Sequence, residues 1–160
     1  IANVSSMKMC RDLVMTWDEL RALAKDPLVT IGAHTRSHYA VAKLSDGDAR
    51  SEMADSVARI TTELGTPCRH FSYPYGCENS AGERDFLLAR ELGMATAVTP
   101  RKGLLYDKHK NQMMALPRLS LNGEYQDSRF VTVLLSGAPF AALNAINRLL
   151  PSRARTPNAA

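Results

Sequence analysis

Apolar residues recur along the chain at intervals of three or four, and short stretches rich in β-branched residues lie between these segments. The pattern predicts helices over 16–25, 45–64, 80–92, 127–135 and 137–150, and strands over 28–32, 70–73, 94–98 and 116–121. Strands that alternate with helices favour a parallel sheet with right-handed crossovers. The predicted fold class is therefore α/β.

Local signals mark where three of these helices begin or end. Thr16 and Glu19 have the spacing of a capping box, and Ser80 and Glu83 have the same spacing later in the chain. Gly65 follows the last periodic residue of the long helix and is typical of a C-terminal cap. The polar segment 99–112 is predicted to be a loop.

The composition is that of one globular domain, with 160 residues of which 45% are hydrophobic. Residues 1–150 are assigned to this domain, and residues 151–160 are predicted to form a disordered tail. No run of about 18 apolar residues occurs, so no membrane span is predicted. The first residues show no signal-peptide pattern and no initiator Met, from which we expect that the chain begins partway through a longer protein. The compartment is not predicted.

The net charge of +4 makes the chain mildly basic. One basic cluster stands out, formed by Arg101, Lys102, Lys108, His109 and Lys110. The cluster falls in the predicted loop, where a solvated surface is a commoner role for such charges than a nucleic-acid site. We therefore predict no nucleic-acid partner.

Two of the four histidines, His34 and His38, follow the predicted strand 28–32 directly. Side chains four residues apart share one face of a helical turn, close enough to bind one metal ion. Neutral imidazole is a good ligand for Zn²⁺, and a catalytic zinc usually has three protein ligands and one open position. Ligands in α/β folds sit at the carboxyl ends of strands, which is where this pair falls. The spacing alone is also common in proteins that bind no metal.

A second candidate segment is 69–76, in which a predicted strand runs into Pro74-Tyr75-Gly76. Such a sequence makes a sharp turn at the end of the strand. Tyr73 and Tyr75 are candidates for an apolar wall that contacts a sugar or an acyl group. The alternative is a structural turn with packed aromatic rings.

Taken together, three segments resemble the polysaccharide deacetylase family, which has the chitooligosaccharide deacetylase homology domain (carbohydrate esterase family 4). They are Trp17-Asp18-Glu19-Leu20, Ile31-Gly32-Ala33-His34-Thr35-Arg36-Ser37-His38 and Phe71-Ser72-Tyr73-Pro74-Tyr75-Gly76. Glu52 and Ser56 between the motifs, and Leu116-Pro117-Arg118-Leu119 after them, also fit the family's spacing. The resemblance covers about residues 15–137.

The resemblance implies part of a distorted (β/α) barrel with parallel strands, of which the first strands are missing here. It implies a metal-dependent hydrolase that removes acetyl groups from a polysaccharide or oligosaccharide, with zinc or another divalent metal as cofactor. His34 and His38 would be metal ligands, and the backbone N–H of Tyr75 would contact the oxyanion. Tyr73, Pro74 and Gly76 would belong to the substrate-binding turn. Arg118 would orient the catalytic base, although a surface or ion-paired role is also open.

The chain departs from the family in one important respect. The family's Thr-Phe-Asp-Asp-Gly motif, which supplies the base and a third metal ligand, is absent, and no two aspartates are consecutive. We therefore expect the chain to start downstream of this motif, the third ligand to be an upstream aspartate, and this chain alone to be inactive or nearly so. An incomplete barrel would leave sheet edges that a second copy could cover. The alternatives are a non-catalytic carbohydrate-binding pseudoenzyme and a small-amide hydrolase of the same superfamily.

Overall fold

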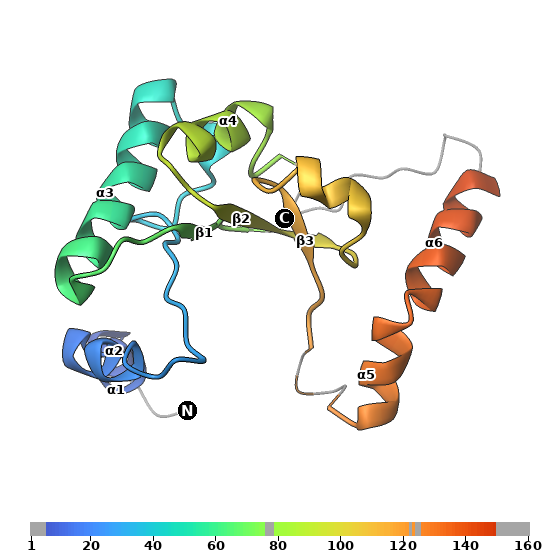
Figure 1. The fold of residues 1–160 in the computed structure, drawn as a ribbon, viewed down its shortest axis with the longest axis horizontal. Coiled ribbons are helices and arrows are strands. Elements are labelled where there is room, and N and C mark those ends of the chain that lie inside the picture. Colours follow the sequence, from blue (N-terminus) through green and yellow to red (C-terminus); the bar gives the residue numbers. More distant parts are fainter. Residues whose placement is uncertain (1–5, 76–78, 122, 124–125, 150–160) are drawn as a thin grey trace.

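A computed structural model describes residues 6–75, 79–121, 123 and 126–149, and a small parallel sheet lies at its centre (Figure 1). The strands are β1 (His70–Ser72), β2 (Thr96–Lys102) and β3 (Leu116–Arg118), in the order β1-β2-β3. Val98 lies opposite Ser72 on one side and opposite Leu116 on the other. All three strands run in parallel, so their carboxyl ends meet at one edge. The predicted α/β class is confirmed.

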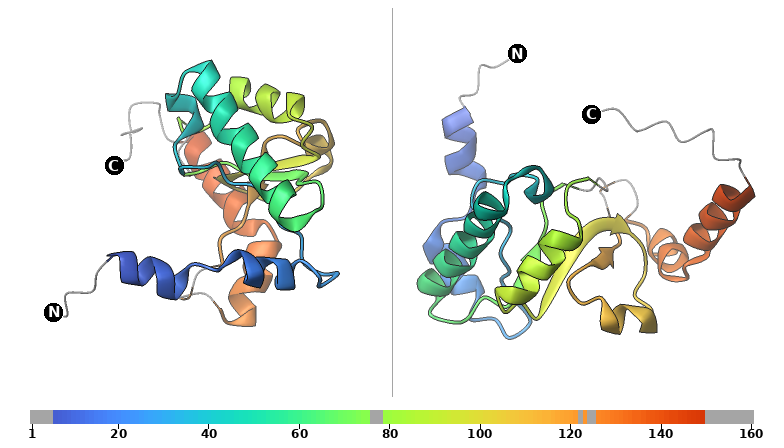
Figure 2. Two further views of the ribbon diagram at one scale, coloured as in Figure 1. Left: turned by 90° about the vertical axis from the view of Figure 1, so that its left-hand side faces the viewer. Right: turned by 90° about the horizontal axis from the view of Figure 1, so that it is seen from above.

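Helices surround this sheet unevenly (Figures 1 and 2). The helices are α1 (Ser6–Leu13), α2 (Trp17–Leu23), α3 (Asp46–Leu64), α4 (Glu83–Glu91), α5 (Ser128–Leu135) and α6 (Ala138–Leu149), with 3₁₀ turns η1 (Val41–Lys43) and η2 (Asp107–Asn111). Helices α3 and α4 cover one face of the sheet, whereas α5 and α6 lie apart from them beyond β3. The helix α1 was not predicted. Among the described residues, no helix is long and apolar enough to cross a membrane.

The predicted caps of α2 and α3 are confirmed. The Glu19 N–H donates to Thr16 Oγ1 at 3.3 Å, and the Thr16 N–H donates to Glu19 Oε2 at 2.7 Å, which completes the capping box. The helix α3 begins after Ser45, whose hydroxyl accepts the Asp48 N–H at 3.2 Å. It ends at Gly65, whose φ of 67° requires the left-handed region that glycine tolerates best.

The predicted capping box of α4 is wrong. The cap is Gly82, and its N–H donates to the Asp85 carboxylate at 2.8 Å, so neither Ser80 nor Glu83 forms the expected pair. The cap lies two residues later than predicted because Asp85, which is almost completely buried, supplies the capping carboxylate.

The predicted strand over 28–32 is also wrong. Only Ala33 pairs with β1, through an isolated bridge in which its N–H donates to His70 O at 2.8 Å and its carbonyl accepts the Ser72 N–H at 2.8 Å. Gly32 lies so close to β1 that a Cβ there would be 2.9 Å from the His70 carbonyl oxygen. Leu28, with 92% of its surface exposed, lies outside this contact, so the apolar run does not extend the sheet.

The other strands differ from the prediction in length. The strand β2 extends through Pro100 to Lys102, into the predicted loop, because β3 pairs along it as far as Arg118 opposite Lys102. The strand β3 ends at Arg118, three residues before the predicted end at residue 121. The predicted tail over 151–160 lies outside the described residues.

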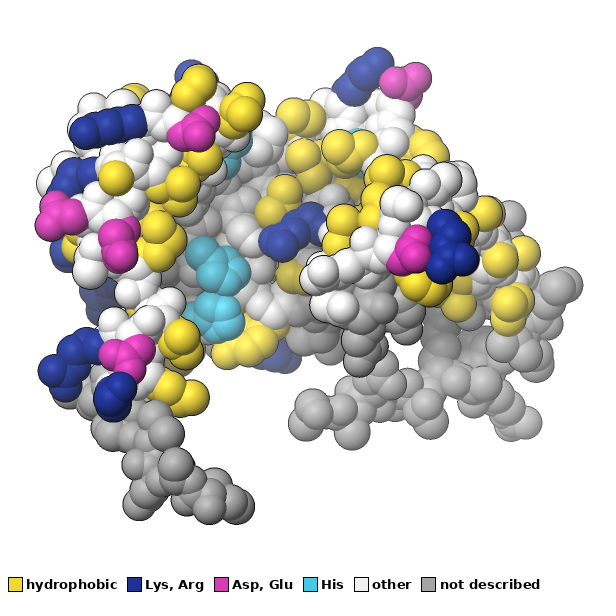
Figure 3. Space-filling model, turned by 90° about the horizontal axis from the view of Figure 1, so that it is seen from below, with side chains coloured by type: hydrophobic (Ala, Val, Ile, Leu, Met, Phe, Trp, Pro, Cys, Tyr) yellow, Lys and Arg dark blue, Asp and Glu magenta, His cyan; other side chains and the backbone are white. Residues whose placement is uncertain are grey.

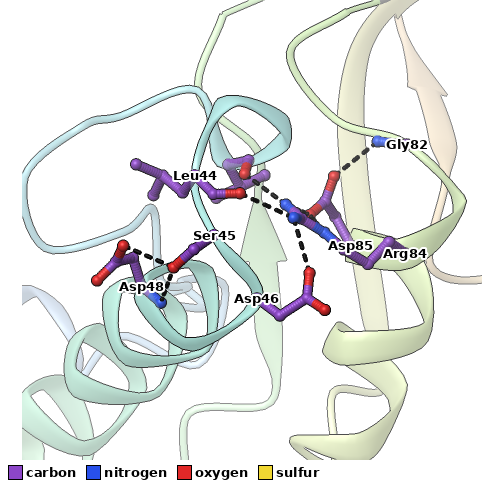
Figure 4. A network of polar contacts seen from close by, with 8 residues as sticks. Leu44, Ser45, Asp46, Asp48, Gly82, Arg84 and Asp85 are labelled. Atoms are coloured by element: carbon purple, nitrogen blue, oxygen red, sulfur yellow. Dashed lines mark hydrogen bonds and ion pairs between the residues drawn. The ribbon is translucent and has the colours of Figure 1, made fainter.

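The hydrophobic core lies between the sheet and the helices α3 and α4. Its largest completely buried side chains include Tyr73, Met53 and Val41. Arg84 of α4 lies at the margin of this core. Its guanidinium donates to the carbonyl oxygens of Leu44 and Val41 at 2.8 and 2.6 Å (Figure 4). The same group also bonds Asp46 and the buried Asp85, so one side chain ties η1 and the start of α3 to α4.

Candidate functional site

The two histidines of the first motif lie side by side, with their ring centroids 4.8 Å apart and the rings at 67°. The segment between them is not the predicted helical turn, because Thr35 and His38 have φ angles of 62° and 59°. This left-handed backbone is uncommon for residues other than glycine. The loop, not a helix, therefore brings the rings together. Figure 3 shows two adjoining histidine side chains on this exposed face, beside a hollow.

The orientation of His34 is set by β1. Its Nδ1 lies 2.7 Å from the carbonyl oxygen of Ser72, the last residue of that strand. A carbonyl oxygen can only accept, so Nδ1 carries the proton. In the neutral ring Nε2 is then left with its lone pair. This is the arrangement in which metal-ligating histidines are usually held.

Tyr75 lies against the second histidine, with its ring centroid 4.9 Å from that of His38. Its φ is 61°, and 53% of its surface is exposed. Its backbone N–H has no hydrogen-bond partner in the part of the chain that the structure describes. The sharp turn predicted from Pro74-Tyr75 thus leaves a backbone donor unused beside the histidines. Gly76 lies outside the described residues.

Tyr73 does not form an exposed wall with Tyr75, contrary to the prediction, and Pro74 of the predicted turn is also buried. The side chains of Tyr73 and Pro74 are both completely buried. The Tyr73 hydroxyl donates to the backbone oxygens of Asp85 and Met114, at 3.3 and 3.1 Å, and its ring packs at 5.1 Å from that of Phe71. Burial raises the pKa of this phenol, and the nearby Asp85 carboxylate raises it further. Tyr73 is therefore a core residue that anchors the turn from behind.

Arg118 lies at the end of β3 and reaches across to β1, where its Nη1 donates to Ser72 Oγ at 3.1 Å. The side chain is exposed. It pairs with no carboxylate within the described ranges. The arginine and His34 thus meet the same residue, one at its side chain and the other at its carbonyl oxygen.

One residue of the site was not singled out from the sequence. Glu52 lies on the buried face of α3, only 9% exposed, and its Oε2 accepts the backbone N–H groups of Arg36 and Ser37 at 3.0 and 2.8 Å. Its fit to the family's spacing was the only signal for it. Within the same loop, the Thr35 hydroxyl oxygen is buried without a hydrogen-bond partner.

The donor set fits part of a metal site. His34 offers a free Nε2 beside a second imidazole, which suits a divalent ion such as Zn²⁺. Among the described residues, no group of three or more His, Cys, Asp or Glu side chains could hold a metal ion. A catalytic zinc site needs a third protein ligand, and the described part of this chain supplies only two.

A family model described as polysaccharide deacetylase matches residues 3–97. None of the curated proteins matches the sequence significantly.

Three solved structures share the fold. A Streptococcus pyogenes deacetylase, PplD, in complex with acetate has a TM-score of 0.66 and 18% identity, over 75% of this chain and 50% of that one. IcaB from Ammonifex degensii has a TM-score of 0.59 and 18% identity, over 75% and 52%. The BpsB deacetylase domain from Bordetella bronchiseptica has a TM-score of 0.53 and 20% identity, over 67% and 49%. The chain thus spans about half the length of each structure, and the predicted part of a (β/α) barrel is confirmed.

Proposed function

The chain belongs to the polysaccharide deacetylase family, and we propose that it forms part of a metal-dependent hydrolase that removes acetyl groups from a polysaccharide or oligosaccharide. One observation carries the proposal. The ring of His34 is fixed by the Ser72 carbonyl so that its Nε2 keeps its lone pair, His38 lies beside it, and Tyr75 packs against His38, all after the carboxyl end of β1.

In this proposal His34 and His38 hold a divalent metal, with zinc as the first candidate. A metal held there would polarise the acetyl carbonyl and lower the pKa of a bound water. Both histidines are exposed, so an acetylated chain can approach them without rearrangement of the core. The third ligand is proposed to be an aspartate upstream of this sequence, since the described residues offer no third candidate.

Tyr75 and Arg118 take the remaining roles. The unused N–H of Tyr75 can donate to the oxyanion that forms when the acetyl carbonyl is attacked. Arg118 has its guanidinium next to Ser72 and no carboxylate partner among the described residues, so it can orient a carboxylate base. Because the described residues offer no third metal ligand and no carboxylate paired with Arg118, the 160-residue chain alone is expected to show little turnover.

The test is zinc content and acetate release, measured on this chain and on a version extended at its N-terminus along the same gene. The substrate is an acetylated chitooligosaccharide. We expect about one zinc per extended chain, acetate release by it, and the loss of both on His34→Ala. His109→Ala removes a histidine from η2 and is the matched control, expected to keep both. An extended chain that binds no zinc and releases no acetate would overturn the proposal.

A non-catalytic carbohydrate-binding protein is the second candidate, favoured by the lack of a three-ligand cluster among the described residues. It predicts that oligosaccharide binds to the extended chain without acetate release. A small-amide hydrolase would instead release product from a small amide and not from the oligosaccharide.

The pairing of copies at open sheet edges remains a prediction. Sedimentation of the chain at several concentrations tests it.

A further inference from the structure

The loop between the two histidines is held by one residue of α3, Glu52, through its buried carboxylate and through its backbone oxygen, which accepts the Arg36 N–H at 3.2 Å. Glu52 lies on the face of α3 that packs inward, together with Ala49, Met53 and Ser56. It is the only acidic residue among these four buried residues. Its Oε2 accepts two consecutive backbone N–H groups, those of Arg36 at 3.0 Å and Ser37 at 2.8 Å. Hydrogen bonds from N–H groups to an ionised carboxylate are about twice as strong as neutral ones.

This loop has a conformation that its own sequence disfavours. Thr35 and His38 both have positive φ, and Thr35 is β-branched, which makes the left-handed region especially costly. Such backbone persists only where the surroundings determine it. Consecutive N–H groups around one anion form a concave site of the kind called a nest, and here Glu52 occupies that site. The carboxylate therefore offsets the strain of the segment that carries both imidazoles.

No basic side chain in the described residues forms an ion pair with Glu52. The Arg36 guanidinium instead pairs with Asp55, one turn further along α3, at 3.2 Å and on the surface. The loop thus meets two carboxylates of the same helix in different ways. Glu52 binds its backbone from a buried position, and Asp55 binds only an exposed side chain.

We infer that Glu52 is a positioning residue of the proposed metal site, which fixes the backbone of the loop so that His34 and His38 converge. This inference rests on the proposed function for its consequence, weaker metal binding, but its structural part stands without metal. Glu52 does not touch the histidine rings itself. Replacement of outer residues that support ligands typically lowers metal affinity about 10–100-fold.

The experiment compares Glu52→Gln with Asp55→Asn, which also removes one negative charge beside the loop but leaves the backbone contacts intact. Binding of Zn²⁺ alone is measured by calorimetry, on the extended chain and on this one. Amide hydrogen exchange at Arg36 and Ser37 is followed by NMR without metal. We expect Glu52→Gln to weaken zinc binding about tenfold or more and to speed exchange at both amides. The larger effect is expected at Ser37, because the Arg36 N–H also donates to the Glu52 backbone oxygen at 3.2 Å. Asp55→Asn is expected to change neither by more than about threefold.

Failure of the proposed function is distinguishable from failure of this inference. If the unaltered protein binds no zinc, the amide exchange still decides, and faster exchange only in Glu52→Gln supports the positioning role. Equal exchange and equal zinc affinity in Glu52→Gln and the unaltered protein would overturn it. If Glu52→Gln does not fold by circular dichroism, Glu52→Asp is used, which keeps the charge but withdraws the carboxylate by one methylene. Unchanged exchange at both amides in that variant also overturns the inference.

Discussion

The Nδ1 atom of His34 lies 2.7 Å from the carbonyl oxygen of Ser72, so the first histidine of the pair is tied to the end of β1. This contact joins a loop residue to the sheet across 38 positions of sequence. It fixes the ring orientation through a backbone atom, which no substitution at position 72 removes. The site is therefore attached to the sheet at His34. The loop segment between the two histidines is attached to α3 through Glu52.

The first prediction concerns the tautomers of two histidines. His34 is expected to carry its proton on Nδ1, since Nδ1 faces a carbonyl oxygen. His109 is expected to carry it on Nε2, since its Nδ1 accepts the Tyr106 N–H at 2.8 Å. Proton–nitrogen correlation NMR near pH 8, without metal, distinguishes the two forms of the neutral ring. A proton on Nε2 of His34 would contradict its expected arrangement, and His109 serves as the reference for that form.

A second prediction separates Arg118 from the metal ligands, on the premise that the extended chain is active. Arg118→Ala is expected to lower kcat about 10–100-fold by removing the group that orients the base, and to keep zinc affinity within about threefold. Ser72→Ala is the matched variant, because it removes the 3.1 Å bond to Arg118 but keeps the carbonyl that holds His34. It should lower kcat less than Arg118→Ala does. A loss of zinc affinity on Arg118→Ala as large as that of His34→Ala would show that the arginine supports the metal site.

The sequence predicted best what is encoded within a few residues. The Thr16–Glu19 capping box and the Gly65 cap were recognised because each is a local hydrogen-bonding or φ requirement. The adjacency of His34 and His38 was predicted correctly but for the wrong reason. A helical turn was expected, and the structure has a loop in which Thr35 and His38 have positive φ. The loop depends on Glu52, and no local signal connects residues that far apart.

Burial and strand pairing were harder to predict. Tyr73 was expected to face a ligand, yet contacts to the backbone of Asp85 and Met114, both distant in sequence, hold it in the core. The apolar run 28–32 has the composition of a strand, but only the following Ala33 pairs with β1. Pairing depends on what lies alongside a segment, and composition alone does not contain that information.

The third prediction concerns the stability contributed by Arg84. Arg84→Met removes the guanidinium that donates to the carbonyl oxygens of Val41 and Leu44, although Val41 O keeps the Leu44 N–H at 3.1 Å, and leaves the buried Asp85 without its cation. We expect the free energy of unfolding to fall by about 2 kcal/mol, since Asp85 keeps its bond to the Gly82 N–H.

Urea denaturation measures the change, with Arg50→Met as the matched control. Arg50 pairs with Glu91 on the surface, where both side chains are more than half exposed, so its loss should cost at most about 0.5 kcal/mol. Equal effects of the two substitutions would contradict a special role for the Arg84 network.

The fourth prediction concerns alkaline unfolding and Tyr73. Burial, with a further effect from Asp85, raises the pKa of this phenol in the folded protein, whereas in the unfolded chain a tyrosine ionises near pH 10. Below about pH 10 the phenol is neutral in both states, so its contribution to stability is complete there. As the pH rises further, the unfolded chain releases the proton while the folded protein retains it. Stability is therefore lost progressively above about pH 10.

Tyr73→Phe should remove this contribution to the pH dependence, at a cost in stability near neutrality. At pH 7 it removes the hydroxyl that donates to Asp85 O and Met114 O, and we expect a loss of about 1 kcal/mol. Between about pH 9 and 11 the urea midpoint of the variant should fall less steeply than that of the unaltered chain. Tyr39→Phe, at a tyrosine with 56% of its surface exposed, is the matched control and should keep the original slope. An identical slope in Tyr73→Phe and the unaltered chain would show that groups other than Tyr73 dominate alkaline unfolding.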